Sequence, residues 1–241
     1  MLFATEFFFV FLIFLFPPLK ARPQAGISIQ EIKLTLFSLA MTLACATLFF
    51  FHLDIYKKKY IQGSKINIFV KHSVILIGFG TLVLSSSAFQ AISFFMNKGL
   101  SVQKSLAAPT SFVLWLSLFC ATVFAAFCEE FLYRFYIPDV GTELSDGKFP
   151  LFWEIFAVLI FAFSHFYQGA AGVFNAFFCG IILRLILLKT KSLWCSFGVH
   201  VFYNFFVIFT IRKEYRNENS CYQRRQLFPE VSAHRHGDRV C

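Results

Sequence analysis

Three charged side chains stand close together in a part of this sequence that is otherwise strongly apolar. Glu129, Glu130 and Arg134 lie in "FCEEFLYRFYIP", at the end of a run, residues 110–128, that contains no charge. A charged side chain at the centre of a bilayer costs about 2.5–3.5 kcal/mol, so such residues are expected to be paired or functional. Glu130 and Arg134 are four residues apart and can pair on one helix face. Glu129 is rotated by about 100° from Glu130 and has no local basic partner, which makes it the first candidate for chemistry.

Two later apolar runs also contain polar side chains that can do chemistry. His165 lies in "FAFSHF", and His200 and Asn204 lie in "FGVHVFYN", where their spacing of four puts them on one helix face. Counting a rise of 1.5 Å per residue from the loops on one membrane side, Glu129 and His200 lie about 12 Å deep and His165 about 16 Å deep. Three helices are therefore predicted to bring polar side chains to nearly the same depth.

This combination of side chains has the chemistry needed to hydrolyse an acyl bond. Glu and His together can take a proton from water, while neutral His and Asn side chains can hold a developing oxyanion. Two alternatives stay open: a thiol nucleophile at Cys128, and a zinc or iron site with Glu129, His165 and His200 as ligands. The HExxH pattern of helical zinc proteases is absent from the sequence.

The composition requires that these residues lie in a membrane protein. Of the 241 residues, 58% are hydrophobic and only 15% are charged, against about 25% charged residues in a soluble domain. Long uncharged runs are typical of membrane-spanning helices rather than of barrel strands. The net charge of +9 is spread over loops and the C-terminal end, so nucleic-acid binding is not indicated. The seven cysteines form no CxxC pair, and no disulfide framework is predicted.

The hydrophobic pattern predicts an all-α, polytopic transmembrane bundle of six to seven helices with a conical or cavity-containing core. The predicted spans lie in seven apolar runs, at about residues 2–16, 34–53, 69–96, 110–137, 154–170, 172–188 and 193–211. The first run lacks a small-x-small cleavage site, which favours an uncleaved span over a signal sequence. The expected location is an integral, multi-pass membrane protein, in the cell membrane if the chain is bacterial.

Three segments differ in character along the chain. We expect N-terminal transmembrane helices over residues 1–109, a catalytic transmembrane core over 110–211, and a polar, disordered tail over 212–241. The membrane orientation stays open, because one side has eight Lys and Arg in its loops and the other has five plus seven in the tail.

The three polar groups, in this order, resemble the motifs of a known family. Glu129-Glu130-x-x-x-Arg134, Phe161-x-x-x-His165 and His200-x-x-x-Asn204 are similar to the three motifs of the CPBP intramembrane proteases, which include the type II CAAX prenyl endopeptidases. The stretch "KTKSLWCSFGVHVFYN" also resembles the family's sequence before its last motif. The resemblance covers residues 110–210, and three motifs in order within apolar helices make it fairly specific.

The resemblance implies a metal-independent, membrane-embedded glutamate endopeptidase without a cofactor. By this resemblance Glu129 activates water with the help of His165, and His200 and Asn204 stabilise the oxyanion. The expected partners are the lipid bilayer and a protein or peptide substrate, membrane-proximal or lipid-modified. Two other hypotheses stay open: a non-proteolytic immunity or regulatory protein on the same fold, and a metal-dependent membrane hydrolase.

The resemblance also gives Glu130 and Arg134 a role in ordering the site. The sequence differs from the family pattern at two positions near the motifs. Phe135 stands where family members often have glycine after the arginine, and Lys191 stands where they have glycine in "TGSLW". Neither change removes a catalytic group.

Overall fold

The computed structural model describes residues 28–62, 66–96 and 112–227, and every regular element in these ranges is a helix. The predicted all-α fold is thereby confirmed, whereas the expected first span, residues 2–16, lies outside the described residues. In chain order the elements are α2 (Ser28–Phe51), α3 (Leu53–Tyr56), η1 (Lys57–Ile61), α4 (Ile68–Met96), α5 (Phe112–Glu130), η2 (Phe131–Val140), α6 (Gly141–Leu144), α7 (Pro150–Ser164), η3 (Phe166–Gln168), α8 (Gly169–Thr190) and α9 (Leu193–Leu227).

Four of the described helical segments are long and apolar enough to cross a membrane, and a bent pair can form a fifth span. The four are Ile68–Ile92, Trp115–Leu144, Gly169–Thr190 and Leu193–Thr210, and the bent pair is Leu39–Phe51 with Leu53–Ile61, at 68°. The helix α7 is apolar but has only 15 residues. At 1.5 Å per residue it is about 22 Å long, which is shorter than the hydrocarbon core of a bilayer.

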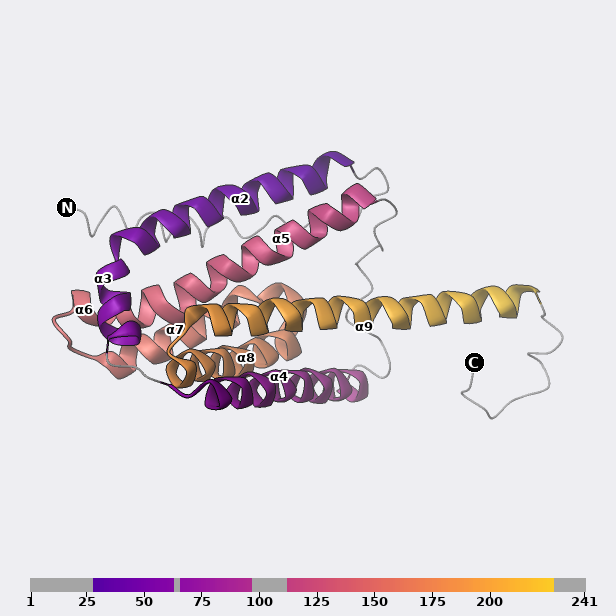
Figure 1. Cartoon of the computed structure of the whole chain (residues 1–241). Helices are drawn as coiled ribbons and strands as arrows, with labels where there is room; N and C mark the ends of the chain where they lie inside the picture. Colours follow the sequence, from indigo (N-terminus) through magenta and orange to yellow (C-terminus); the bar gives the residue numbers. More distant parts are fainter. Residues whose placement is uncertain (1–27, 63–65, 97–111, 228–241) are drawn as a thin grey trace. The chain divides into compact units, whose positions relative to one another are not determined.

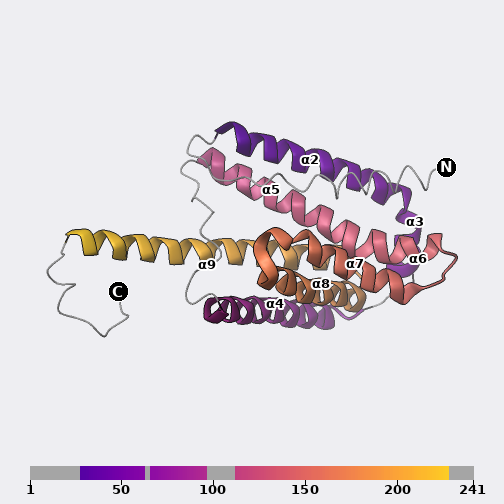
Figure 2. The ribbon, with the colours of Figure 1, turned by 180° about the vertical axis from the view of Figure 1, so that it is seen from behind.

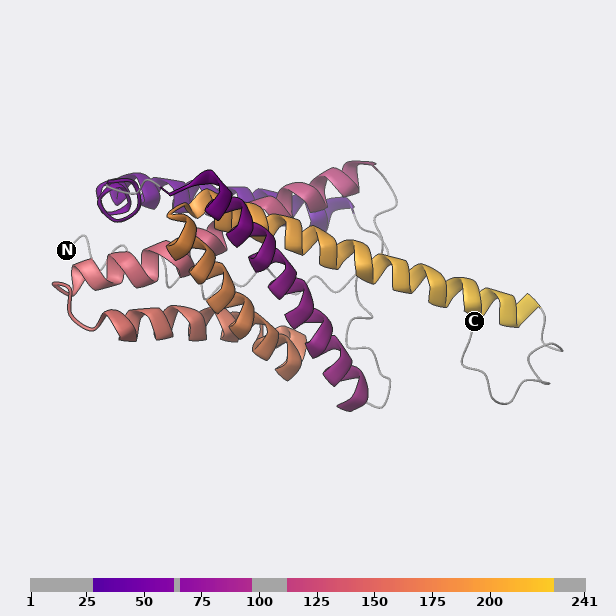
Figure 3. The ribbon, with the colours of Figure 1, turned by 60° about the horizontal axis from the view of Figure 1, so that its bottom comes forward.

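The helices pack in pairs within the first part of the chain. Helix α2 lies along α5, and α4 lies along α8 (Figures 1 and 2). Figure 3 shows α4 and α8 side by side from another direction. Helix α7 contacts both η2 and α8, so η2 is enclosed between α7 and the α2–α3 segment.

The sequence prediction of one α-helix over residues 110–137 is only partly correct. The α-helix α5 ends at Glu130, and the chain continues as the π-helix η2, which contains Pro138 and is buried at every residue. Proline has no N–H and cannot continue the α-helical hydrogen-bond pattern, and π-helical turns are frequent at functional sites. The two glutamates therefore lie in the last turn of α5, and Arg134 lies in the wider turns that follow.

The prediction of helices at 154–170 and 172–188 differs from the structure at their boundary. Helix α7 ends at Ser164, η3 forms one short turn, and α8 begins at Gly169. Gly169 has φ of +81°, a conformation that glycine adopts without steric cost. His165 is consequently the C-cap of α7 rather than a residue within a helix.

One hydrogen bond fixes the start of α9. The backbone N–H of Leu193 donates to the Tyr56 hydroxyl at 3.1 Å, and both residues are buried. The first N–H groups of a helix have no partner within the helix, so a side chain here satisfies one of them. The contact ties the beginning of α9 to the end of α3.

The chain divides into two compact units, Met1–Tyr203 and Asn204–Cys241, and the division falls within α9. The helix continues to Leu227, which extends it into the segment, 212–241, where the sequence suggested a disordered tail. The glutamates, lysines, arginines and glutamines of this stretch have high helix propensity. Residues 228–241 lie outside the described residues.

Candidate active site

Glu130 is a fully buried carboxylate with partners on two elements. One partner is His200 of α9, whose Nδ1 lies 2.9 Å from Glu130 Oε1. The hydroxyl of Ser196, one turn earlier in α9, donates to Oε2. Arg134 completes the group, with Nε 3.6 Å from Oε1. The ion pair expected from the spacing of Glu130 and Arg134 is present.

His200 lies between the two adjacent glutamates. Its Nδ1 faces Glu130, and its Nε2 lies 3.5 Å from Glu129 Oε2. An ionised carboxylate only accepts hydrogen bonds, so Nδ1 is the donor to Glu130. The two carboxylates differ in exposure, because the side chain of Glu129 is 30% exposed and that of Glu130 is 1% exposed. Glu129 is therefore the more exposed of the two carboxylates.

Phe161 of α7 connects the second motif to the other two. Its ring centre lies 4.8 Å from that of His165 and 6.5 Å from that of His200. On the same ring, Arg134 Cζ lies 4.0 Å from the centre, within the range of a cation–π contact. His165 Nδ1 also lies 2.9 Å from the Phe161 carbonyl oxygen. The two histidines and the arginine thus gather around one buried aromatic ring.

Gly180 of α8 makes room for this ring. A Cβ atom at Gly180 would lie 3.2 Å from Phe161 Cδ1, which is closer than an ordinary van der Waals contact. Because Gly180 has no side chain, α8 approaches α7 closely at the level of the site.

The remaining candidates of the sequence analysis have different surroundings. Asn204 lies one turn after His200 in α9 but belongs to the second compact unit, so its contribution to the site stays a prediction. Cys128 is buried, and its Sγ lies 3.5 Å from Thr42 Oγ1 of α2. Within the described ranges, no group of three or more His, Cys, Asp or Glu side chains is arranged to hold a metal ion.

Sequence reasoning missed Ser196. Its signal was available, because Ser196 and His200 repeat the four-residue spacing that His200 and Asn204 show. A small hydroxyl residue in an apolar helix is common and rarely indicates a site. Its burial and its donation to Glu130 single it out only in the structure.

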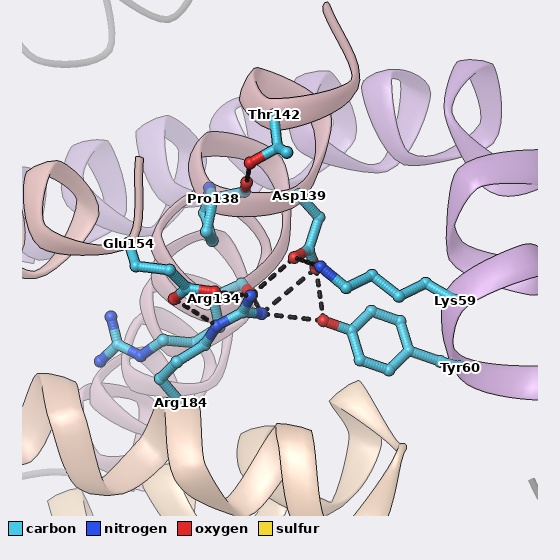
Figure 4. A network of polar contacts seen from close by, with 8 residues as sticks. All are labelled: Lys59, Tyr60, Arg134, Pro138, Asp139, Thr142, Glu154 and Arg184. Atoms are coloured by element: carbon cyan, nitrogen blue, oxygen red, sulfur yellow. Dashed lines mark hydrogen bonds and ion pairs between the residues drawn. The ribbon is translucent and has the colours of Figure 1, made fainter. Parts of the chain in front are cut away.

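Sequence reasoning also missed a second group of charged residues, centred on Arg184 of α8 (Figure 4). Arg184 is buried and forms ion pairs with Asp139 of η2 and Glu154 of α7. Lys59 and Tyr60 of η1 also bind Asp139. Arg184 is the single charge within the apolar run at 172–188, which was the available signal.

These features define a helical, multi-pass membrane protein with a carboxylate–histidine site enclosed by its helices. A comparison with models of protein families matches residues 110–206 to the family described as type II CAAX prenyl endopeptidase Rce1-like. The resemblance drawn from the three motifs is thereby confirmed over this segment, which is less than half of the chain. A search of curated proteins and a search of solved structures each found no match.

Proposed function

We propose that this chain is an intramembrane endopeptidase that hydrolyses a peptide bond of a membrane-proximal or lipid-modified protein. In this proposal Glu129 activates the water molecule, assisted by His165, and His200 and Asn204 stabilise the oxyanion. Glu130 and Arg134 order the site. The family match over residues 110–206 supports a protease, and the roles of the single residues are our assignment from chemistry and geometry.

The observation that carries the proposal is the unequal environment of the two carboxylates beside His200. Glu130 is 1% exposed and is engaged by His200, Ser196 and Arg134. Glu129 is 30% exposed and lies 3.5 Å from the other ring nitrogen of the same histidine. A general base must reach a water molecule, whereas a positioning carboxylate must be held by its neighbours. The geometry supports the role of general base for Glu129 and that of positioning carboxylate for Glu130.

The proposed reaction begins when Glu129 takes one proton from a water molecule. The water oxygen attacks the carbonyl carbon of the scissile peptide bond, and the carbonyl oxygen becomes an oxyanion. Glu129 then gives the proton to the peptide nitrogen, and the C–N bond breaks to release an amine and a carboxylic acid. His165 assists by hydrogen bonding to the attacking water.

The oxyanion role assigned to His200 specifies one of its nitrogens. Because Nδ1 faces Glu130 at 2.9 Å, only Nε2 is available to donate to a substrate oxygen. Since Nδ1 already donates to Glu130, donation from Nε2 requires the doubly protonated form of His200, with a hydrogen on each ring nitrogen. A donor about 3 Å from the developing charge is the geometry that such stabilisation needs. Asn204, one turn further along α9, is the proposed second donor.

The substrate class follows from the position of the site in membrane-spanning helices. A substrate must reach Glu129 from the lipid or from the bilayer surface, which favours a peptide close to the membrane or a chain end with a lipid attached. The family description names prenyl endopeptidases. Prenylated peptides are therefore the first lipid-modified substrates to test, provided that the source cell prenylates proteins.

The proposal is tested with purified full-length protein in detergent micelles or nanodiscs and a panel of fluorogenic peptides, both unmodified membrane-proximal and prenylated. Wild type is expected to cleave at least one class, and Glu129→Gln to lose activity by at least a hundredfold without loss of folded protein. Addition of a chelator is expected to leave the rate unchanged.

Three results would contradict the proposal in different ways. Full activity of Glu129→Gln would remove Glu129 from the mechanism. Loss of activity on chelation, restored by zinc, would indicate a metal-dependent hydrolase. If wild type cleaves no peptide while Glu129→Ala preserves the cellular phenotype of the wild-type gene, the chain is a non-proteolytic interaction protein.

A further inference from the structure

The guanidinium group of Arg134 has few contacts of its own to hold it in place. Among the described residues, its buried Nε and Nη2 atoms have no hydrogen-bond partner, and Nε lies 3.6 Å from Glu130. The Phe161 ring lies against the flat face of the guanidinium group, but this contact does not determine how the group is rotated within its own plane. The position of Arg134 therefore depends strongly on the backbone from which its side chain extends.

That backbone lacks an ordinary helical hydrogen bond. In an α-helix the N–H of residue 138 would donate to the carbonyl oxygen of Arg134, but residue 138 is proline. In the π-helical winding of η2, the N–H that faces the carbonyl oxygen of Arg134 is instead that of Asp139, five residues further on. A carbonyl oxygen has two lone pairs, so this buried group can also accept a hydrogen bond from a side chain of a neighbouring element.

Arg184 supplies this donor from the neighbouring helix α8. Its Nη1 donates to the carbonyl oxygen of Arg134, and Figure 4 shows the Arg184 side chain lying between Glu154 and Asp139. The same guanidinium binds Asp139, five residues after Arg134, with Nη2–Oδ1 at 2.6 Å and Nη1–Oδ2 at 3.2 Å. Arg184 thus binds η2 on both sides of Pro138.

The guanidinium of Arg184 is itself fixed from two further elements. Its Nε donates to Glu154 of α7 at 2.8 Å, and its Nη1 donates to the Tyr60 hydroxyl of η1 at 2.8 Å. Lys59 lies 2.5 Å from Asp139, so two cations and two carboxylates balance in charge. A planar group with five donors is needed to bind these partners at once, and lysine cannot replace it.

We propose that Arg184 is a positioning residue for the catalytic site, because it holds the backbone of η2 so that Arg134 stays against Glu130 and Phe161. The inference rests on the proposed peptidase function. Arg184 acts through Arg134 and touches neither the glutamates nor the histidines of the site. Its replacement is expected to change the turnover rate rather than the binding of substrate.

The kinetic test uses Arg184→Gln and Arg184→Lys, each in the full-length protein, with rates expressed per folded molecule. We expect Arg184→Gln to lower kcat at least tenfold with KM changed less than threefold. Arg184→Lys keeps the buried positive charge, so it provides a folded protein even if Arg184→Gln does not accumulate, and we expect a fall in kcat of at least fivefold. Thr190→Val is the matched control, since it removes another buried polar contact within α8 and is expected to leave kcat unchanged.

A double-mutant cycle separates positioning from a general loss of stability. If Arg184 acts through Arg134, the Arg134→Lys and Arg184→Lys double variant has about the same kcat as the worse single variant. A residue that merely stabilises the fold would give additive losses. Additive losses, or a kcat within twofold of wild type in Arg184→Lys, would overturn the proposal.

Hydrogen exchange keeps this test separate from the test of the peptidase. Amide exchange in residues 131–140 is expected to be at least tenfold faster in Arg184→Lys than in Thr190→Val, which requires no substrate. If wild type cleaves no peptide but exchange in 131–140 is faster, the peptidase proposal fails and the control of the η2 backbone by Arg184 stands. Equal exchange in both variants would overturn the role of Arg184 whatever the activity.

Discussion

The guanidinium carbon of Arg134 lies 4.0 Å from the centre of the Phe161 ring. This contact joins the first motif of the chain to the second, because Phe161 also lies against His165 through ring and main-chain contacts. The ring is buried between helices, so the contact is shielded from water. A desolvated cation–π contact contributes on the order of 2 kcal/mol. Phe161 is therefore a part of the site that the charged residues alone do not reveal.

We expect Phe161→Leu to lower kcat/KM by about tenfold, which corresponds to 1.4 kcal/mol. Leucine keeps most of the apolar volume but offers no ring face to Arg134 and no edge to His165. Phe156→Leu is the matched control on the same helix, because its ring stacks on Phe152 instead of contacting the site. The measurement is kcat/KM for peptide cleavage by the two variants. An equal fall in kcat/KM in both would show that the Phe161 ring has only a packing role.

The two glutamates should differ in their effect on stability. Glu130→Ala leaves Arg134 and His200 buried without their carboxylate, and such losses cost about 3–5 kcal/mol. Glu129→Ala is expected to cost less than about 1 kcal/mol, because its side chain is partly exposed and its contact with His200 is longer. The loss of stability in each variant is measured by thermal unfolding of the detergent-solubilised protein. A lower unfolding temperature for Glu129→Ala than for Glu130→Ala would reverse the assigned roles.

Gly180→Ala tests how closely the Phe161 ring must be placed. The added methyl group would lie 3.2 Å from Phe161 Cδ1, so the ring must shift by a few tenths of an ångström. We expect a loss of about threefold to tenfold in kcat, since small displacements of a positioned group are costly in catalysis. Gly198→Ala is the control, because a Cβ there has no neighbour within 4 Å, and it is expected to retain wild-type kinetics. An identical kcat in Gly180→Ala and Gly198→Ala would show that the site does not require a close fit between Gly180 and the Phe161 ring.

Ser196→Ala removes the hydroxyl that donates to Glu130. A buried acceptor that loses a donor costs about 1–3 kcal/mol, and we expect the unfolding temperature and kcat both to fall. Cys195→Ala changes the neighbouring residue of α9, which faces a different direction, and is expected to have little effect. An unaltered unfolding temperature in Ser196→Ala would mean that Glu130 is held by His200 and Arg134 alone.

Spacing within one helix predicted the local charge pair of the candidate site but not the contacts between its helices. The spacing of four correctly indicated the pairing of Glu130 with Arg134, because both residues are close in one helix. The division of roles between Glu129 and Glu130 stays a prediction, which their unequal exposure supports. The tertiary contact of His200 with Glu130 was not expected, since it depends on the relative rotation of α5 and α9, which a single helix pattern does not determine.

The group around Arg184 shows why the rest could not be predicted. Its members come from η1, η2, α7 and α8, and apart from Arg134 and Asp139 within η2 the partners of Arg184 are far apart in the sequence. The π-helix that they surround contains Pro138, and sequence rules associate proline with a helix end rather than with a change of winding. Hydrophobic periodicity reveals neither long-range contacts nor local deviations from the α-helix.

The hydrogen bond between Leu193 and Tyr56 sets a limit on how the length of this chain can vary. It fixes the first residue of α9, and His200 follows seven residues later in one continuous helix. Inserting or deleting a single residue between these two points would turn the histidine by about 100° around the helix axis, away from Glu130. Homologues with a working site should therefore vary in length in the connections between helices, and keep the interval from Leu193 to His200 constant.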